Sequence, residues 1–398
     1  MTSMFIYDDG ASQTHFDMTQ WAILNDFAAG DFGRETSTKF TLFGTGVEYV
    51  FTGTDLTYDS NGVPTGGTIS HLREIDTTYD NHNIVGVKDF NITVQQLDTF
   101  ALTNDVSGFE NSVFGSGGDT YTISAHYQTV HIVGTDGDDT FRCPYGPVLN
   151  TADTLDGGAG TNTIIFNGGA GGGVSAGVPL LLQQGMLENI QDIVLKGNLK
   201  YDVELIDPNI SGGKTLTLDA HALPASDPVM AFVFYQSVNV NFIGTPGNDQ
   251  YIGSLGDDQI TGGLGSDVLS GITGHNTFIY HSAAESSGAS ADAITDFVAS
   301  KDHFQMPVAV NAMDAPITTG TLDYGANFDA ELQVALKGHL NAGDALLFTP
   351  DSGNLAGFTI LVVDQNGHAG YQSGHDIVIQ LGGHNTDLTG FSAANFIT

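Results

Sequence analysis

The sequence predicts a mostly all-β protein that contains a right-handed parallel β-roll or β-solenoid, and three observations support this fold class. Glycine contributes 52 of the 398 residues and charged residues only 14%, which argues against a helical protein. Thr, Val, Ile, Phe and Tyr are frequent, as in strands. A nine-residue unit is repeated four times without a gap across residues 244–279. Around this repeat we expect a β-rich N-terminal region and a small α+β C-terminal cap.

The four repeat units share glycine at their first and fourth positions. Each unit ends in a minimal strand whose eighth residue is large, apolar and expected to face inward. These eighth residues are Tyr251, Ile260, Leu269 and Phe278. The sixth position holds an oxygen-bearing side chain in every unit, provided by Asp249, Asp258, Asp267 and Asn276.

The spacing of these oxygens predicts a calcium site between turns. If two units form one coil, residues 18 apart stack at roughly 4.8 Å, so Asp249 lies over Asp267 and Asp258 over Asn276. Stacked carboxylates repel, and a divalent cation with backbone carbonyls turns that repulsion into binding. Glycine allows positive φ and a close approach to the ion, which gives Gly247, Gly256 and Gly265 their place in the predicted site. An ordinary Gly/Asp-rich loop would not keep four units in register.

The pattern G-G-x-G-x-D-x-U-x resembles the calcium-binding nonapeptide of RTX proteins. Such proteins typically leave the cell through a type I secretion channel by means of an uncleaved C-terminal signal. The resemblance therefore implies calcium as cofactor, the type I secretion apparatus as a partner and a secreted, extracellular or cell-surface location. It also fits an N-terminus without the basic and apolar regions of a Sec signal peptide.

Charge and cysteine content exclude several classes of protein. The net charge of −36 makes nucleic acid and anionic membranes poor partners. Cys143 is the single cysteine, so no disulfide framework is possible. No stretch approaches 18 uninterrupted apolar residues, so we expect no transmembrane helix.

Residues 1–108 are expected to form a β-rich domain with one helix. That helix has Asp17 as its N-cap and Gly30 as its stop. Strand-like alternation runs from Phe40 to about Leu97, with turns at 61–62 and 66–67.

Residues 109–243 are expected to form an irregular β-solenoid built from degraded repeats. The unit at 134–142 has Asp139 at its sixth position, and the unit at 157–165 has Asn162 there. The two are not 18 residues apart and lack adjacent partners. Bound calcium at Asp139 and a metal-free turn therefore both stay open. The glycine-rich stretch 168–173 predicts a flexible loop.

The segment that follows the repeat, from Phe278 to Asp302, resembles the C-terminal domain of serralysin-type metalloproteases of peptidase family M10. The order of Phe, Ser-x-x-Glu-Ser and Asp-x-Ile-x-Asp-Phe is the same. The resemblance implies that Asp292, together with Asp296 and Asp302, contributes to a further ion site or caps the coil. The alternative is that these residues only form turns. The RTX β-roll then covers 244–300, and a capping and secretion-signal domain covers 301–398.

The last hundred residues predict one helix at 328–339 and strands at 345–348, 358–363 and 377–381. A loop between the last two strands offers oxygen ligands at Asp364, Asn366 and Asp376. It suits calcium, with a plain hairpin loop as the alternative.

Catalytic motifs are mostly missing. The zinc motif H-E-x-x-H of serralysins is absent, so the resemblance carries no protease activity. Gly173-Val-Ser-Ala-Gly177 lacks the strand and helix that a nucleophile elbow needs. We therefore assign no catalytic residue and lean against an enzyme.

The favoured function is that of a secreted calcium-binding protein that folds on calcium outside the cell. We expect it to serve a structural or adhesive role at the cell surface or in a matrix, with itself or a cell-surface polysaccharide as its partner. The alternatives are a hydrolase or lyase, acting on polysaccharide, with its site in residues 1–240, and a binding or signalling module.

Overall fold

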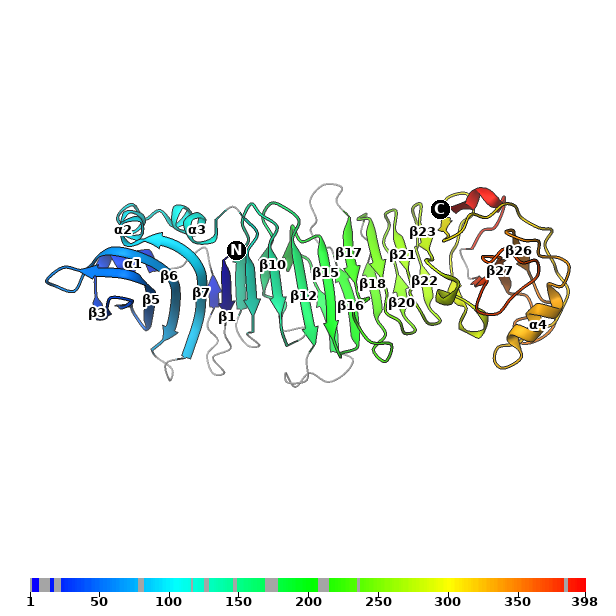
Figure 1. Cartoon of the computed structure of the whole chain (residues 1–398), viewed down its shortest axis with the longest axis horizontal. Coiled ribbons are helices and arrows are strands. Elements are labelled where there is room, and N and C mark those ends of the chain that lie inside the picture. Colours follow the sequence, from blue (N-terminus) through cyan, green and yellow to red (C-terminus); the bar gives the residue numbers. More distant parts are fainter. Residues whose placement is uncertain are drawn as a thin grey trace. The chain divides into compact units, whose positions relative to one another are not determined.

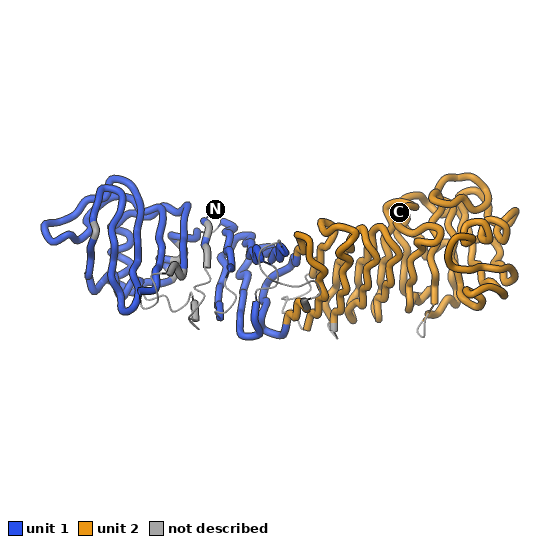
Figure 2. The backbone as a smooth tube through the Cα atoms, turned by 90° about the horizontal axis from the view of Figure 1, so that it is seen from below, with its two compact units in different colours: residues 1–173, 183–193 blue, residues 174–182, 194–398 orange. Residues whose placement is uncertain are grey.

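The computed structural model describes residues 2–6, 15–17, 23–77, 82–115, 117–124, 129–145, 149–168, 178–206, 215–234, 237–382 and 386–398. It consists of two compact units, Met1–Gly173 with Gln183–Ile193 and Val174–Leu182 with Val194–Thr398, which Figure 2 colours separately. Both are mostly β with parallel sheets, so the mostly all-β prediction is confirmed at that level. The division at residues 108, 243 and 300 stays a prediction.

Unit 1 begins with an antiparallel sheet whose strands follow chain order (Figure 1). Its strands are β3 (Phe32–Thr36), β4 (Lys39–Phe43), β5 (Val47–Tyr58), β6 (Pro64–Asp76) and β7 (His82–Thr93). A turn at Asp59–Gly62 joins β5 to β6 as predicted. The second predicted turn is wrong, because residues 66–67 lie within β6.

Three helices accompany this sheet: α1 (Ile23–Ala29), α2 (Val94–Thr103) and α3 (Val106–Phe114). Helix α1 packs its Phe27 ring against Phe40 and Phe51, with centroids 6.4 and 6.2 Å apart. Asp17, its predicted N-cap, lies at the end of strand β2 (His15–Asp17), and the predicted first turn at 18–22 lies outside the described residues. Helix α2 was not expected; a capping box between Thr93 and Gln96 starts it, so the strands end before Leu97.

The rest of unit 1 alternates between two parallel sheets. One continues from β1 (Ser3–Ile6), which pairs with β7, through β8 (Thr120–Ile123), β10 (Thr140–Cys143) and β12 (Thr163–Gly168). The other contains β2, β9 (Thr129–Val133), β11 (Thr154–Asp156) and β14 (Leu187–Glu188). Strand β15 (Asp192–Gly197) follows β14 in the chain.

Unit 2 also alternates between two parallel sheets. The first contains β17 (Leu216–Asp219), β19 (Val240–Ile243), β21 (Gln259–Thr261), β23 (Thr277–Ile279), β25 (His303–Gln305) and β29 (Phe396–Ile397). The second contains β13 (Val178–Leu182), β16 (Tyr201–Ile206), β18 (Met230–Phe234), β20 (Gln250–Ile252), β22 (Val268–Ser270), β24 (Asp292–Ile294) and β28 (Ile377–Leu381).

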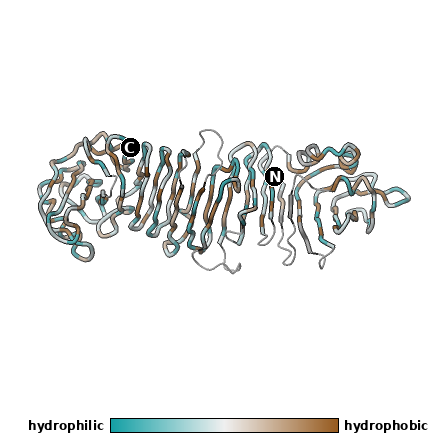
Figure 3. Tube along the Cα trace, turned by 180° about the vertical axis from the view of Figure 1, so that it is seen from behind, coloured by the Kyte–Doolittle hydropathy of each residue, from teal (hydrophilic) through white to brown (hydrophobic). Residues whose placement is uncertain are grey.

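The register of the repeat places two nonapeptides in each coil, as expected. Tyr251 lies beside Leu269 and Ile260 beside Phe278. These eighth-position side chains are at most 1% exposed and form the interior of the coils. Figure 3 shows hydrophobic residues along the strands of unit 2.

The C-terminal part of unit 2 has its own core. Antiparallel strands β26 (Ala345–Phe348) and β27 (Thr359–Val363) extend the sheet from β28, which confirms the three predicted strands. Helix α4 (Phe328–Ala335) is shorter than predicted. The chain beyond it still buries Leu336 and Leu340 in the same hydrophobic cluster as Phe328 and Leu332. Short 3-10 turns lie at Ala283–Glu285 (η2), Gly288–Ser290 (η3) and Ala393–Asn395 (η4).

Candidate calcium centre

The sixth-position side chains of the repeat hydrogen-bond to the backbone of the neighbouring coil. Oδ1 of Asp249 accepts the N–H of Val229 at 2.6 Å, and Oδ1 of Asp267 accepts the N–H of Asp249 at 2.8 Å. Oδ1 of Asp292 in turn accepts the N–H of Asp267 at 2.9 Å. We call Asp249, Asp267 and Asp292 the first ladder. Asp292, which entered the prediction only through a family resemblance, thus occupies the next step of the repeat.

A second ladder lies on the other sheet and contains Asp258, Asn276 and Asp302. Oδ1 of Asp258 accepts the N–H of Val240 at 2.9 Å, and Oδ1 of Asn276 accepts the N–H of Asp258 at 3.1 Å. Oδ1 of Asp302 accepts the N–H of Asn276 at 2.9 Å. The expected stacking of Asp249 on Asp267 and of Asp258 on Asn276 is therefore present in the structure.

The ladder positions are of two kinds, which differ in whether the second carboxylate oxygen, Oδ2, accepts a backbone N–H. Oδ2 of Asp249 accepts the N–H of Thr245, and Oδ2 of Asp258 accepts the N–H of Ser254. By contrast, Oδ2 of Asp267 is buried and makes no hydrogen bond within the described part of the chain. Oδ2 of Asp292 is also buried, and the Tyr280 hydroxyl beside this carboxyl acts as a hydrogen-bond donor that opposes the rise in its pKa. A buried carboxylate oxygen without a partner costs free energy, so Oδ2 of Asp267 is where a cation would contribute most.

The glycines of the repeat are required mainly by close contacts. At the first position, a Cβ on Gly244 would lie 2.6 Å from Oδ2 of Asp249, and one on Gly262 would overlap Oδ2 of Asp267. At the fourth position, a Cβ on Gly247, Gly256 or Gly265 would overlap a backbone carbonyl of the preceding coil. Of these five glycines only Gly265 has positive φ, at 128°. The expected role of glycine in giving positive φ is therefore limited, and close approach is the general reason.

Burial raises the pKa of the ladder carboxylates. It raises the pKa of Asp249 and Asp258. It raises that of Asp267 to about 8, with the charges of Asp249 and Glu285 adding to the effect. It raises that of Asp292 well above the usual range, and the negative charge of Asp267 raises it further. A bound divalent cation would favour the charged carboxylates and oppose these shifts.

The donor set fits calcium. The unpartnered Oδ2 of Asp267, the Asp292 carboxylate and the carbonyls beside the fourth-position glycines are all oxygen donors, the ligands that calcium takes in flexible geometry. In the residues that the structure describes, no three His, Cys, Asp or Glu side chains form a metal site by themselves. An ion held at the first ladder would therefore take backbone carbonyls as further ligands.

Unit 1 contains a third ladder, formed by Asp119, Asp139 and Asn162. Oδ1 of Asp139 accepts the N–H of Asp119 at 2.7 Å, and Oδ1 of Asn162 accepts the N–H of Asp139 at 2.8 Å. The expectation that the units around Asp139 and Asn162 lack adjacent partners is therefore wrong. These coils are 20 and 23 residues long instead of 18, which hides the register from a fixed count.

Asp119 is a site residue that the sequence analysis missed. Its Oδ2 is buried without a hydrogen bond among the described residues, and burial raises its pKa to about 6. A three-residue pattern could have identified it: an Asp or Asn at positions 119, 139 and 162 is followed each time by Thr and then by a large apolar residue that is buried.

The C-terminal loop brings its three predicted ligands together. Nδ2 of Asn366 donates to Oδ1 of Asp376 at 3.1 Å, and Oδ1 of Asp364 accepts the N–H of Asn366 at 2.9 Å. Burial and the neighbouring Asp364 raise the pKa of Asp376 to about 7. The same contacts would build a plain loop, so calcium at this position stays a prediction.

The remaining candidates have structural partners or fall outside the described part. Asp296 accepts hydrogen bonds from Ser270 and from the backbone of Gly271 and Ile272. His131 lies in β9 beside Thr154. Ser175 and residues 169–173 of the predicted loop lie outside the described residues. No described helix is long and apolar enough to cross a membrane.

Stacked coils with buried oxygen ladders define a calcium-binding repeat protein. Comparison with known families agrees: residues 233–389 match the model "Peptidase M10 serralysin C terminal", and residues 150–171 match "RTX calcium-binding nonapeptide repeat (4 copies)". The first match includes both ladders of unit 2, and the second includes Asn162. The resemblance inferred from the sequence is thereby confirmed, with calcium as the cofactor of the repeat. A search of curated proteins finds no match.

Proposed function

We propose that this chain is a secreted RTX protein whose ladder coils form a calcium-filled β-roll outside the cell, and that it serves as a structural or adhesive component of a cell surface or matrix. One observation carries the calcium-binding part of the proposal. Oδ2 of Asp267 is buried without a hydrogen bond, among the described residues, one ladder step from the buried carboxyl of Asp292. This arrangement is unfavourable without a cation and favourable with one.

The energetics suit a folding switch. Extracellular calcium sites bind at about 10⁻⁴ to 10⁻³ M, so they stay empty in a cytosol with far less free calcium. At millimolar calcium each site stabilises the fold by roughly 0.4 to 1.4 kcal/mol. Several coupled sites, with relief of repulsion in a chain of net charge −36, would decide between unfolded and folded states. An unfolded chain suits passage through a type I secretion apparatus.

The structural or adhesive role rests on the repetitive architecture. Coils that contact only their neighbours build a long surface from little sequence information. An acidic surface that calcium neutralises would also let copies of the chain approach one another. For the enzyme alternative, the cavity on β4 to β7 has no carboxylate among its lining residues. A second cavity, beside β16, β18 and β20, has one carboxylate, Asp202, next to Tyr201, so neither of these two cavities holds the pair of carboxylates that a glycoside hydrolase uses.

The test is a calcium titration of the purified chain, followed by circular dichroism and light scattering in the same sample. We expect the β-signal to appear at submillimolar to millimolar calcium, with scattering rising at the same or a higher concentration. Magnesium is the control ion, since its demand for octahedral geometry suits this backbone-rich site poorly. A β-signal that excess chelator leaves unchanged would refute calcium-driven folding. Folding without any assembly, on its own or with surface polysaccharide, would refute the structural role alone.

A further inference from the structure

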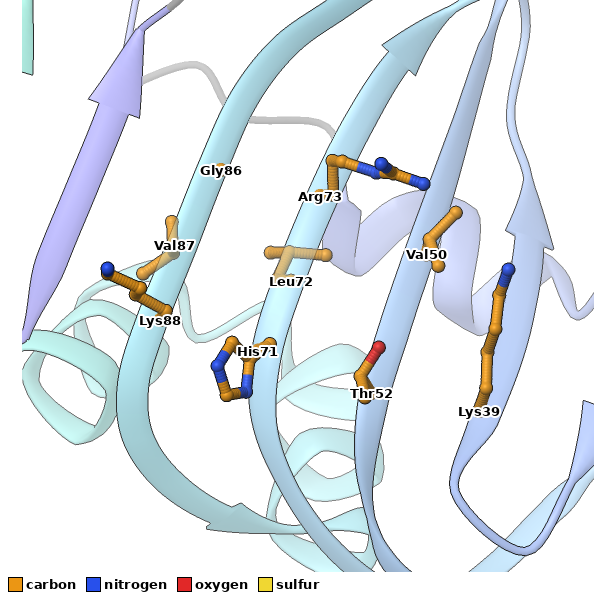
Figure 4. Close-up of a pocket in the computed structure, with 9 residues that line it drawn as sticks. All are labelled: Lys39, Val50, Thr52, His71, Leu72, Arg73, Gly86, Val87 and Lys88. Carbon is orange, nitrogen blue, oxygen red and sulfur yellow. The ribbon is translucent and has the colours of Figure 1, made fainter.

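A row of basic side chains crosses the antiparallel sheet of unit 1. Lys39 of β4 pairs with Thr52 of β5, Thr52 pairs with His71 of β6, and His71 pairs with Lys88 of β7. Directly opposed residues on neighbouring strands point to the same face. Figure 4 shows these four side chains on neighbouring strands, with Arg73 two residues beyond His71 on β6. We call Lys39, Thr52, His71, Arg73 and Lys88 the basic row.

The basic row lies on the face of the sheet that α1 does not cover. Phe40 and Phe51, each one residue from the row, point to the other face, where they pack against Phe27 of α1. The row therefore lines an open cavity of about 540 Å³. A cavity of this size is in the range of small-ligand sites.

The charge of this cavity is opposite to that of the chain. The protein has ten Lys and Arg residues against 46 acids. Three of the ten line this one cavity with His71, and none of its nine lining residues is acidic. In a chain of net charge −36, such a concentration of cations focuses attraction for anions at one place.

A β-bulge sets the alignment. Opposite β5, Ser70 is an extra residue, because Ile69 pairs with Gly53 and His71 with Thr52. Opposite β7 the longer segment is on β7, where residues 89–91 lie between the partners of Ile69 and His71. The hydroxyl of Ser70 lies 2.9 Å from Nδ1 of His71, within hydrogen-bond distance. Without this bulge His71 would be turned to the other face, away from the row.

The spacing of the cations selects the shape of the ligand. Adjacent strands lie roughly 4.8 Å apart, so Lys39 and Lys88 are separated by three strand spacings, roughly 14 Å. A single small anion cannot contact both ends of such a row, but an extended chain with several anionic groups can. Arg73 suits a carboxylate, which it can bind through two parallel hydrogen bonds. The Thr52 hydroxyl between the cations suits a sugar hydroxyl.

We propose that the basic row binds an acidic polysaccharide that carries carboxylate groups. The proposed extracellular role enters only as the source of this ligand. Calcium-driven folding and polysaccharide binding use different residues, in the ladders and in β4 to β7, so either can fail without the other.

The test is calorimetric titration of the full chain at constant calcium with trigalacturonate, with maltotriose as the uncharged control and inorganic phosphate as the small anion. We expect trigalacturonate to bind and the other two to show no measurable heat. The double substitution Lys39→Gln with Arg73→Gln should weaken binding about tenfold or more, because it removes two charge-assisted contacts. Lys337→Gln, an exposed lysine after α4, is the matched control and should bind like wild type.

Arg73→Lys keeps the positive charge but cannot form the bidentate hydrogen bond to a carboxylate, so this variant should bind trigalacturonate with intermediate affinity. An unchanged circular dichroism spectrum and calcium midpoint identify the variants as folded. The proposal is overturned if trigalacturonate does not bind, if the double variant binds it as tightly as wild type, or if phosphate or maltotriose binds equally well. It is also overturned if the double variant loses calcium-dependent scattering while keeping trigalacturonate affinity, since the row would then contact a second copy of the chain.

Discussion

The backbone N–H of Asp249 donates to Oδ1 of Asp267 at 2.8 Å, across 18 residues of chain. The same residue type therefore does two things at each step of the repeat. Its amide and one oxygen join neighbouring coils, and its remaining oxygen is available to a cation where no backbone N–H reaches it.

Removing calcium should open the ladder coils of unit 2 before the antiparallel sheet of unit 1. The coils between residues 240 and 300 hold buried carboxylates and short three-residue strands. By contrast, β5 and β6 are long, and they pack on α1 and α2 respectively. Hydrogen exchange with and without chelator should show early loss of protection at 250–252, 259–261, 268–270 and 277–279. Equal loss of protection in β5 and β6 at the same chelator concentration would contradict this order.

Asp267→Asn should lower calcium affinity about tenfold, because ligand charge sets the strength of such sites. The amide oxygen can still accept the N–H of Asp249, as Asn276 does for Asp258 at 3.1 Å, so the coil keeps its register. The calcium-free protein should become more stable, since Asn, unlike Asp267, does not have to bind a proton or bury a charge on folding. The converse change, Asn276→Asp, should raise calcium affinity and destabilise the calcium-free form. Calcium titrations monitored by thermal unfolding measure both effects.

The control for this pair is Asp257→Asn, at an exposed acid one position before the ladder. It should leave the calcium midpoint unchanged. If Asp257→Asn lowers affinity as much as Asp267→Asn does, general charge rather than the ladder position governs binding.

Gly256→Ala should destabilise the calcium-bound protein by about 1–3 kcal/mol through overpacking. Its Cβ would overlap the carbonyl of Val238 and lie 2.7 Å from Oδ1 of Asn239. Gly382→Ala is the matched control, because its Cβ would meet Phe358 at an ordinary 3.7 Å. Chemical denaturation in excess calcium compares the two; a loss of stability as large in Gly382→Ala would show that the close contact is not the cause.

The calcium-free protein should become more stable as the pH falls from about 8 to 5. Burial raises the pKa of Asp267 to about 8 in the folded state, above the value of about 4 for an unfolded aspartate. A raised folded-state pKa gives stability that is full below the unfolded value and is lost as the pH rises through the folded one. The melting temperature in chelator, measured across this range, checks the sign.

Calcium should reverse this trend, because its ligands must be deprotonated and protons compete with it. In Asp267→Asn the dependence in chelator should be smaller. A melting temperature in chelator that falls on acidification from pH 8 to 5 would be incompatible with buried, proton-binding carboxylates at the ladders.

The regular part of the fold was predictable because its period can be counted. Gly, an Asp or Asn and a large apolar residue recur every nine positions. The stacking of residues 18 apart follows once two units form one coil, because paired strands lie about 4.8 Å apart. The inward direction of Tyr251 and Phe278 and the stacking of Asp249 on Asp267 needed nothing further. The strands 345–348 and 377–381 were likewise predictable from continuous apolar runs bounded by polar turns.

The irregular coils were not predictable, because their length varies while their contacts do not. The bond between Asp119 and Asp139 spans 20 residues and that between Asn162 and Gln191 spans 29. No fixed spacing finds such pairs. The basic row was hidden for another reason: Lys39, His71 and Lys88 come together only through strand pairing and one bulge, which the sequence pattern does not specify.

Coil length and coil register are therefore uncoupled in this protein. The same side-chain bond closes coils of 18, 25 and 26 residues in unit 2. Each coil can thus gain or lose surface sequence without disturbing the one above it, provided that the Asp or Asn is retained. Natural variation, or the grafting of a foreign peptide, can therefore change the exposed segment of one coil at a time while the ladder hydrogen bonds and the buried core stay the same.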